Sequence, residues 1–482
     1  MKIYRKYIGA FGLGVVLISG CSIPAKVAKK PEVISPDGFS ESELSDTSNI
    51  AKLKYADFFN DPLLVQVIDN VVQQNFDHRI ALQQLQIASA QLSMRRGALL
   101  PNIQAVLSAS GTRYGKYTIE GVGNFDTNLS PNIEENQKVN TNITPNYWLG
   151  LSASWEIDIW GKLANLKRAA QSRYLATEQG RQALQSALVT QATTLYYELI
   201  TLDRQQAILE ENIKLQESAL EMVKVQKEVG RATELAVQQF TAQLANTRAI
   251  LIELKQQTVN TENRLLQLMG KYEGNIARAK KIVPVQLAYN TQFGHPAQLL
   301  QNRPDISRAY SELEASHADA KAARAAFFPT VSITGYGAFN AFNGAQVFNP
   351  MSLVFQLLGN MVAPVFQQNQ LKAQFKIATA QQEMAFLAYQ KNIVEAFQEV
   401  KTLLSYIEAN EDIVGYKQTE VAALARSVEV SNDLYVSGYA NYLEIISAQR
   451  SKIAADIDLI MAKRNQAQAM IQLYKALGGG WN

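Results

Sequence analysis

An internal duplication constrains the fold of this chain more than any other feature of its sequence. Residues 76–111 resemble residues 304–339, and matched positions lie 228 residues apart. Residues 229–239 resemble residues 437–449, and matched positions there lie 208 residues apart. The matched identities are Asp77 and Asp305, Ala81 and Ala309, Ala90 and Ala318, Pro101 and Pro329, Gly230 and Gly438, Leu235 and Leu443, and Gly270 and Gly478. The chain is therefore a tandem duplication, and both halves must share one layout.

The two offsets differ by 20 residues, so the first half carries a surplus between its two matched segments. The surplus falls in residues 115–146, which are rich in Asn, Gly, Thr and Pro. Such a composition is typical of loops. We expect one enlarged surface loop in the first half.

Each half predicts a very long helix after its extended segments. In the first half this helix covers about residues 163–229, which at 1.5 Å per residue span on the order of 100 Å. A heptad seam follows its second part at Leu195, Leu199, Leu202, Gln206, Leu209, Ile213, Gln216, Leu220 and Val223. The second half repeats the seam at Phe397, Val400, Leu404, Ile407, Glu411, Val414, Gln418 and Val421. We therefore expect coiled-coil packing along both helices.

Four extended segments interrupt the helices, at about residues 102–114, 147–159, 330–342 and 351–363. From Tyr147 to Trp160 the odd positions are apolar and the even positions are mostly small or acidic, which is strand alternation. The lengths and patterns fit membrane β-strands, which need about nine to eleven residues and an apolar exterior. Four strands cannot close a barrel, so several copies must contribute to one. A solvated coiled-coil rod would explain the helices but not these strands.

Composition excludes several other classes. Only 26 glycines and 13 prolines occur in 482 residues, which favours long helices. The net charge is +3, and removal of the basic leader brings it to zero, so we expect no nucleic-acid partner. The three histidines lie far apart, without ligand spacing, and no metal site or cofactor is predicted. A periplasmic enzyme would need a catalytic motif such as G-x-S-x-G, and none occurs, so the chain is predicted not to be an enzyme.

The N-terminus has the pattern of a lipoprotein signal peptide, residues 1–20. A basic start is followed by an apolar run too short to span a membrane, and small residues precede Cys21, the only cysteine. We expect cleavage before Cys21 and covalent lipid on it, rather than a chance leader thiol or a nucleophile. Ser22 follows in place of the Asp that resembles an inner-membrane retention signal, so the outer membrane is favoured.

The mature chain is predicted to have four parts. Residues 21–60 form a lipid-anchored tether, and residues 61–270 form the first repeat, with a helix, two barrel strands and a long helical hairpin. Residues 271–300 form a linker or equatorial segment. Residues 301–482 form the second repeat, with the same elements and the C-terminus.

Several motifs add a family resemblance. These are "RPDI" at residues 303–306, "AFFP" at residues 326–329 and "LGGGW" at residues 477–481, together with the lipoprotein leader and the duplication. The combination resembles the outer-membrane factor family of TolC-like efflux channels, and most closely its lipoprotein branch. The resemblance implies a mixed α/β membrane protein that forms a homotrimer. A twelve-stranded outer-membrane β-barrel, with four strands per chain, would continue into a long α-helical periplasmic barrel of coiled coils.

The resemblance also implies partners and a function. A periplasmic adaptor and an inner-membrane transporter of the resistance-nodulation-division type would join this chain in a tripartite pump. The chain would conduct drugs or other small molecules passively to the exterior. The alternatives are a conduit for metal ion efflux or for type I protein secretion, which the sequence does not separate from drug efflux. Adaptor contacts are expected at the hairpin tips, at Gly230, Arg231, Gly438 and Tyr439.

A periplasmic gate is expected on the turn after Gly438 and the helix that follows. Leu443, Ser447 and Arg450 share one stripe, with Glu444 beside it, and three-fold symmetry would turn each into a ring. By resemblance Leu443 is an apolar constriction residue, Glu444 an acidic one and Arg450 a basic one, whereas Ser447 stands where the family often has Asp. Tyr435 matches a tyrosine that helps to latch the closed tip. The alternative is that Glu444 and Arg450 are ordinary surface charges. A neighbouring stripe, suited to helix packing, holds Tyr442, Ile446 and Ile453.

Overall fold

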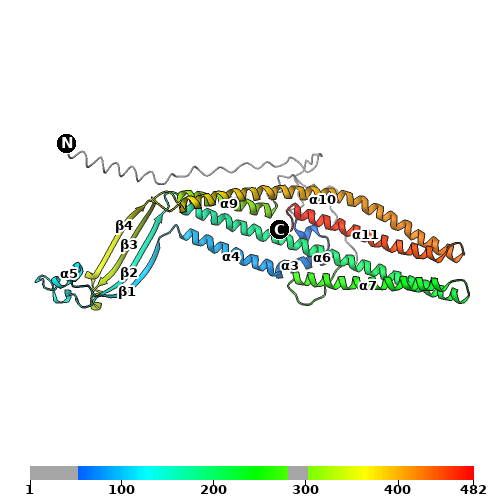
Figure 1. Cartoon of the computed structure of the whole chain (residues 1–482), viewed down its shortest axis with the longest axis horizontal. Coiled ribbons are helices and arrows are strands. Elements are labelled where there is room, and N and C mark those ends of the chain that lie inside the picture. The colour runs from blue at the N-terminus through cyan, green and yellow to red at the C-terminus, as the bar shows by residue number, and fades with distance from the viewer. Residues whose placement is uncertain (1–52, 280–301, 482) are drawn as a thin grey trace, which may run out of the picture. The chain divides into compact units, whose positions relative to one another are not determined.

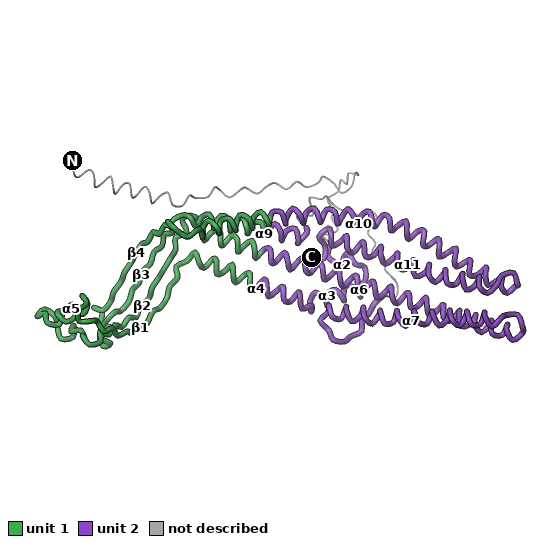
Figure 2. The backbone as a smooth tube through the Cα atoms, viewed as in Figure 1, with its two compact units in different colours: residues 1–30, 87–174, 312–385 green, residues 31–86, 175–311, 386–482 purple. Residues whose placement is uncertain are grey.

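A computed structural model describes residues 53–279 and 302–481 of the chain. The signal peptide, Cys21 and most of the predicted tether and linker lie outside these residues. The chain divides into two compact units, coloured separately in Figure 2. Each unit draws on both sequence repeats, so the repeats and the units cut the chain differently. None of the helices in the described ranges has an apolar stretch long enough to cross a bilayer.

The first unit contains a four-stranded antiparallel sheet in the order β1-β2-β3-β4 (Figure 1). The strands are β1 (Asn102–Thr112), β2 (Thr144–Ile157), β3 (Thr330–Ala341) and β4 (Leu353–Val362). Each sequence prediction lies within three residues of these bounds. Strands β1 and β4 form the two edges of the sheet within the chain.

The register places the alternating residues of all four strands on two contrasting faces. In one row Leu107 pairs with Leu149, Leu149 with Phe339 and Phe339 with Leu353. The apolar face therefore holds Ile103, Ala105, Leu107, Leu149, Leu151, Trp155, Ile333, Phe339, Leu353, Phe355, Leu357 and Met361. The opposite face holds mostly uncharged polar residues, including Asn102, Gln104, Ser152, Ser154, Thr334, Tyr336, Asn340, Gln356 and Asn360. The predicted two-faced strands thus form one two-faced sheet.

The loops of this unit differ in size, as the 20-residue surplus predicts. The β1–β2 connection carries a short helix, α5 (Ile119–Thr127), and a 3-10 turn, η2 (Glu135–Gln137). The β3–β4 connection carries only the turns η3 (Gly344–Gln346) and η4 (Pro350–Ser352). Most side chains of the longer connection are exposed, so the expected surface loop is present, and α5 is an addition to it. Thr118 caps α5 by accepting a hydrogen bond from the Gly121 N–H.

The helices of the two repeats have equal lengths. Helices α4 (Phe76–Gly97) and α9 (Pro304–Ala325) each have 22 residues. Helices α6 (Lys162–Glu228) and α10 (Gln370–Val436) each have 67, within one residue of the prediction for α6. The return helices α7 (Glu234–Leu268) and α11 (Tyr442–Ala476) each have 35. These lengths agree with the internal duplication.

Equivalent contacts close the ends of both return helices in the second unit. The Asn75 side-chain amide donates to the Leu268 carbonyl at 3.0 Å, and Arg303 donates to the Ala476 carbonyl at 2.9 Å. These donors are 228 residues apart and these acceptors 208 apart, as the two offsets require. In the second repeat the donor is charged and also binds Glu399 on α10 at 2.7 Å. The Arg of "RPDI" therefore ties the end of α11 to α10.

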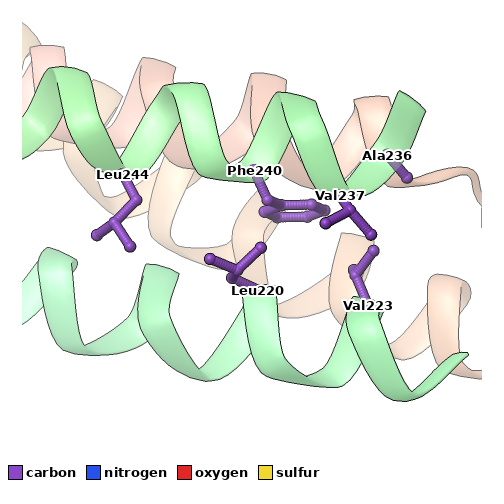
Figure 3. Close-up of a cluster of buried hydrophobic side chains, with 6 residues drawn as sticks. All are labelled: Leu220, Val223, Ala236, Val237, Phe240 and Leu244. Carbon is purple, nitrogen blue, oxygen red and sulfur yellow. The ribbon is translucent and has the colours of Figure 1, made fainter. Parts of the chain in front are cut away.

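The α6 seam is confirmed as a packing surface. Figure 3 shows Leu220 and Val223 of α6 against Val237, Phe240 and Leu244 of α7. Residues Tyr442, Ile446, Ile453 and Ile457 of α11 also pack on the seam, as predicted for the first three. Even Gln216 in the seam is only 1% exposed.

The α10 seam is less covered than predicted. Val400 is fully buried, but Val414 and Val421 are half-buried and the seam residues Glu411 and Gln418 are exposed. The reason is that α7 and α11 cover the α6 seam, whereas the described residues of the chain supply no equivalent cover for this part of α10.

Two segments predicted to lie outside the repeats pack within the second unit. Helices α2 (Tyr55–Phe58) and α3 (Pro62–Gln74) both belong to the second unit, although residues 55–60 were assigned to the tether. Phe58 and the aromatic residue that follows it are both buried. The Phe58 ring stacks on the Tyr474 ring with 4.1 Å between ring centroids. Likewise Arg278, assigned to the linker, donates to Asp203 and Glu262 in the same unit. The predicted domain boundaries remain predictions.

Candidate channel gate and coupling tips

The two hairpin tips of the second unit share one backbone geometry. Gly230 has φ +72° and Gly438 has φ +81°, a left-handed conformation that glycine adopts without strain. The Arg231 N–H donates to the Gln226 carbonyl and the Tyr439 N–H to the Leu434 carbonyl, each at 2.8 Å. Both helices thus end in the same glycine turn, at the positions predicted for the tips.

The side chains at the tips project outward. Tyr439 is 84% exposed, and Arg231 is exposed as well. In the first tip Lys227 forms an ion pair with Glu234 across the turn, and this hydrogen bond lowers the pKa of Glu234. Exposed aromatic and arginine side chains are common at protein–protein interfaces. The tips therefore present residues suited to a partner protein.

Four of the five predicted gate residues lie together on α11 and point away from its packed face. Leu443 is 47% exposed, and Glu444, Ser447 and Arg450 are exposed. Asn441 caps the helix by accepting from the Leu443 N–H at 2.7 Å, and Glu444 follows in the first turn, where the helix dipole favours negative charge. Among the described residues, neither Glu444 nor Arg450 forms an ion pair. Both charges are thus displayed on the surface of the single chain.

The two hairpins are joined close to their tips. The Tyr435 hydroxyl on α10 donates to the Gln226 side-chain oxygen on α6. Partial burial raises the pKa of Tyr435, so the hydroxyl remains a donor at neutral pH. Beyond the Gly438 turn, at the start of α11, the Tyr442 ring lies 6.5 Å from the ring of Phe240, which belongs to the cluster shown in Figure 3. Separation of the hairpin tips would have to break these two contacts.

Sequence analysis missed Gln226. It is equivalent to Leu434 at the 208-residue offset, so a polar side chain replaces an apolar one at matched positions of the two tips. That contrast is the only signal the sequence carries for it.

His78 takes no part in this site. His78 is 8% exposed, its ring nitrogen lies 3.3 Å from an Arg181 nitrogen, and burial lowers its pKa. His295 lies outside the described residues. Within residues 53–279 and 302–481, no cluster of His, Cys, Asp or Glu side chains could hold a metal ion.

Comparison with known proteins decides the family. The sequence profile described as "Outer membrane efflux protein" matches residues 67–271 and 295–479. The chain belongs to the outer membrane efflux protein family. This membership confirms the resemblance read from "RPDI", "AFFP" and "LGGGW", and it makes the chain an outer-membrane channel protein of efflux systems that extends into the periplasm.

Two relatives and one solved structure cover nearly the whole chain. The cation efflux system protein CusC of Escherichia coli O6:H1 is 28% identical over 468 residues, 96% of each chain. The antibiotic efflux pump outer membrane protein ArpC of Pseudomonas putida is 30% identical over 476 residues, 96% of this chain and 94% of the relative. A crystal structure of CusC matches with a TM-score of 0.81 and 27% identity, covering 95% of this chain and 100% of that one. The long helices and the four-stranded sheet are therefore a fold that this efflux protein shares with a solved relative.

Proposed function

We propose that three copies of this efflux protein form one passive conduit, with a twelve-stranded barrel in the outer membrane and a helical tunnel in the periplasm. The observation that carries the proposal is the two-faced sheet. Its apolar face, with Leu107, Leu357 and Phe355 between 79% and 84% exposed, suits lipid, and its polar face suits a water-filled lumen.

The edges of the sheet support closure between copies. An open edge leaves backbone N–H and C=O groups without partners, which is prohibitively costly in lipid. Strand β4 runs antiparallel to β1, because four strands alternate in direction. The β4 edge of one copy can therefore continue the antiparallel pattern with β1 of the next. Three copies would give the twelve strands that the family resemblance implies.

The α10 seam also favours assembly. On this helix Val414 and Val421 are half-buried and Tyr416 is 78% exposed. The chain itself therefore covers the helix only in part. Helices α6 and α7 of a neighbouring copy would supply the missing cover. This contact between copies would need the same three-fold arrangement as the barrel.

The tips are the regulated end of the conduit. Rings of Leu443 and Glu444 would narrow the tunnel, with Ser447 and Arg450 further along the same face. The Tyr435–Gln226 hydrogen bond would hold the closed state. A periplasmic adaptor would dock at Gly230, Arg231, Gly438 and Tyr439 and would separate the hairpins. An inner-membrane transporter of the resistance-nodulation-division type would supply the cargo.

Drugs or other small organic molecules are the proposed cargo, and the chain performs no catalysis. Glu156 is the only charged residue on the four strands, so the barrel offers little to bind metal cations. Metal ion efflux remains the alternative because relatives include the cation efflux protein CusC. Type I protein secretion is a further alternative.

Deletion of the gene, followed by complementation, tests the cargo. We expect the deletion strain to become sensitive to amphiphilic antibiotics, with unchanged tolerance of copper and silver and unchanged secreted proteins. Complementation with the native gene should restore resistance. Sensitivity to metals alone would favour the alternative, and unchanged tolerance of every compound with loss of a secreted protein would favour secretion.

A further inference from the structure

Two aromatic rings meet on the polar face of the sheet. Trp148 of β2 and Tyr336 of β3 form an edge-to-face pair with 4.8 Å between ring centroids and 67° between planes. The register pair between them is Gly150 and Ala338. These small residues leave room for the rings to lean together, and Ala338 is only 2% exposed beneath them. A side chain at Gly150 would collide with Ala338, since an added Cβ would lie 2.2 Å from its methyl carbon.

The indole N–H of Trp148 differs from those of the other tryptophans. Trp155, Trp160 and Trp481 donate to backbone carbonyls of Leu99, Pro329 and Asn302, respectively. Among the residues that the structure describes, Trp148 has no hydrogen-bond acceptor. Its ring is half-buried and keeps this donor on the polar face. The three partnered rings serve the fold, whereas Trp148 presents both an aromatic surface and a donor.

A shallow hollow of about 320 Å³ adjoins this pair on the same face. Tyr336 forms one wall, and the other side chains that line it are small or carry amides and hydroxyls. The hydrogen-bonding members are Asn102, Gln104, Ser152, Ser154, Thr334 and Gln356. Of the described residues that line the hollow, none is charged. It therefore combines one aromatic wall with several uncharged hydrogen-bond donors and acceptors.

We propose that Trp148, Tyr336 and the adjoining hollow form a binding station for aromatic solutes, uncharged or singly positive, in transit through the barrel. The rings offer stacking and cation–π contacts, and the amides orient polar substituents. Inorganic cations find no charged ligand in this station, because none of the described residues that form it is a carboxylate. The proposal rests on the proposed function, in which the polar face lines the lumen, and a trimer would carry three stations.

Block of ion current through the purified protein in planar bilayers tests the station. Ethidium, an aromatic monocation, is added on the side of the bilayer onto which the barrel end of the protein opens. Tetraethylammonium, a monocation without an aromatic ring, is added in the same way for comparison. We expect ethidium to reduce the current at lower concentrations than tetraethylammonium. In Trp148→Leu/Tyr336→Leu the half-blocking concentration of ethidium should rise about tenfold, and that of tetraethylammonium should not change. Trp155→Leu, on the apolar face of the same strand, is the matched control and should leave both concentrations unchanged.

Each other outcome overturns a defined part of the account. Equal ethidium block in the native protein and the double variant, or equal block by the two cations, would refute the station while leaving the conduit intact. Absence of any ion current from correctly assembled native protein would refute the conduit and the station together. Should the double variant fail to assemble, Tyr336→Gln, which copies the neighbouring Gln104 and Gln356, provides the same comparison with a smaller expected rise.

Discussion

The hydrogen bond between Tyr435 and Gln226 should set how readily the tips separate. Tyr435→Phe removes one hydroxyl and keeps the half-buried ring. A neutral hydrogen bond contributes about 1 kcal/mol net. Loss of that amount would favour separation about fivefold in each chain. If three chains open together, the effects multiply to on the order of 100-fold.

Single-channel recording in planar bilayers measures this shift as the fraction of time spent in high-conductance states. We expect Tyr435→Phe and Gln226→Leu to raise that fraction to similar extents. The double variant should add little to either single change, because both remove the same bond. Tyr439→Phe alters the same chemical group at the exposed tip, where the structure gives it no role in joining the hairpins, and should behave as the native protein.

An unchanged open fraction in Tyr435→Phe, with the trimer intact, would refute the latch. Additive effects in the double variant would also contradict it, since they would show that the two side chains act independently. A lower melting temperature alone would indicate that the bond stabilises the hairpins without controlling the gate.

Three further predictions address the lipid anchor, the gate and pH. Mass spectrometry of membrane-extracted protein should find lipid on Cys21, and an unmodified thiol there would contradict the anchor. Cys21→Ser should reduce outer-membrane targeting more than pore conductance. Leu443→Ala combined with Glu444→Ala should raise single-channel conductance and admit large antibiotics, and unchanged conductance in an intact trimer would move the gate elsewhere. Burial lowers the pKa of His78 in the folded chain below its usual value of 6.5. As the pH falls below about 6.5, the unfolded chain therefore binds this proton before the folded chain does, and the melting temperature should decrease. His78→Gln should remove part of that drop, and an identical pH profile in this variant would contradict the assignment.

Periodic features of the sequence predicted the elements well. Alternating apolar positions together with the duplication located all four strands to within three residues. The helical pattern that follows Gly161 located α6 to within one residue, and its heptad seam predicted the face on which it packs. The glycine turns at Gly230 and Gly438 were found because the duplication marks them twice. The i, i+4, i+7 spacing placed Leu443, Ser447 and Arg450 on one stripe of α11, and all three side chains are exposed there. Their role in a gate stays a prediction.

Contacts between distant parts of the chain were beyond the sequence. The pairing of Tyr435 with Gln226 joins residues 209 positions apart, and no local pattern specifies it. The packing of Phe58 on Tyr474 likewise places the end of the predicted tether within a folded unit. The α10 seam shows the opposite case, where the apolar pattern is present and the single chain covers it only in part.

Disulfide trapping across the sheet edges tests the assembly of one barrel from several chains most directly. In a Cys21→Ser background, Leu107→Cys on β1 is combined with cysteine at each apolar-face position of β4 in turn, and intermolecular bonds are read on denaturing gels. Leu149→Cys with Phe339→Cys, a register pair inside one chain, is the control and should give only monomers. The account predicts that at least one β1–β4 combination forms covalent dimers and trimers and that the ladder stops at three. Monomers alone in every combination, or a ladder that passes three, would contradict it.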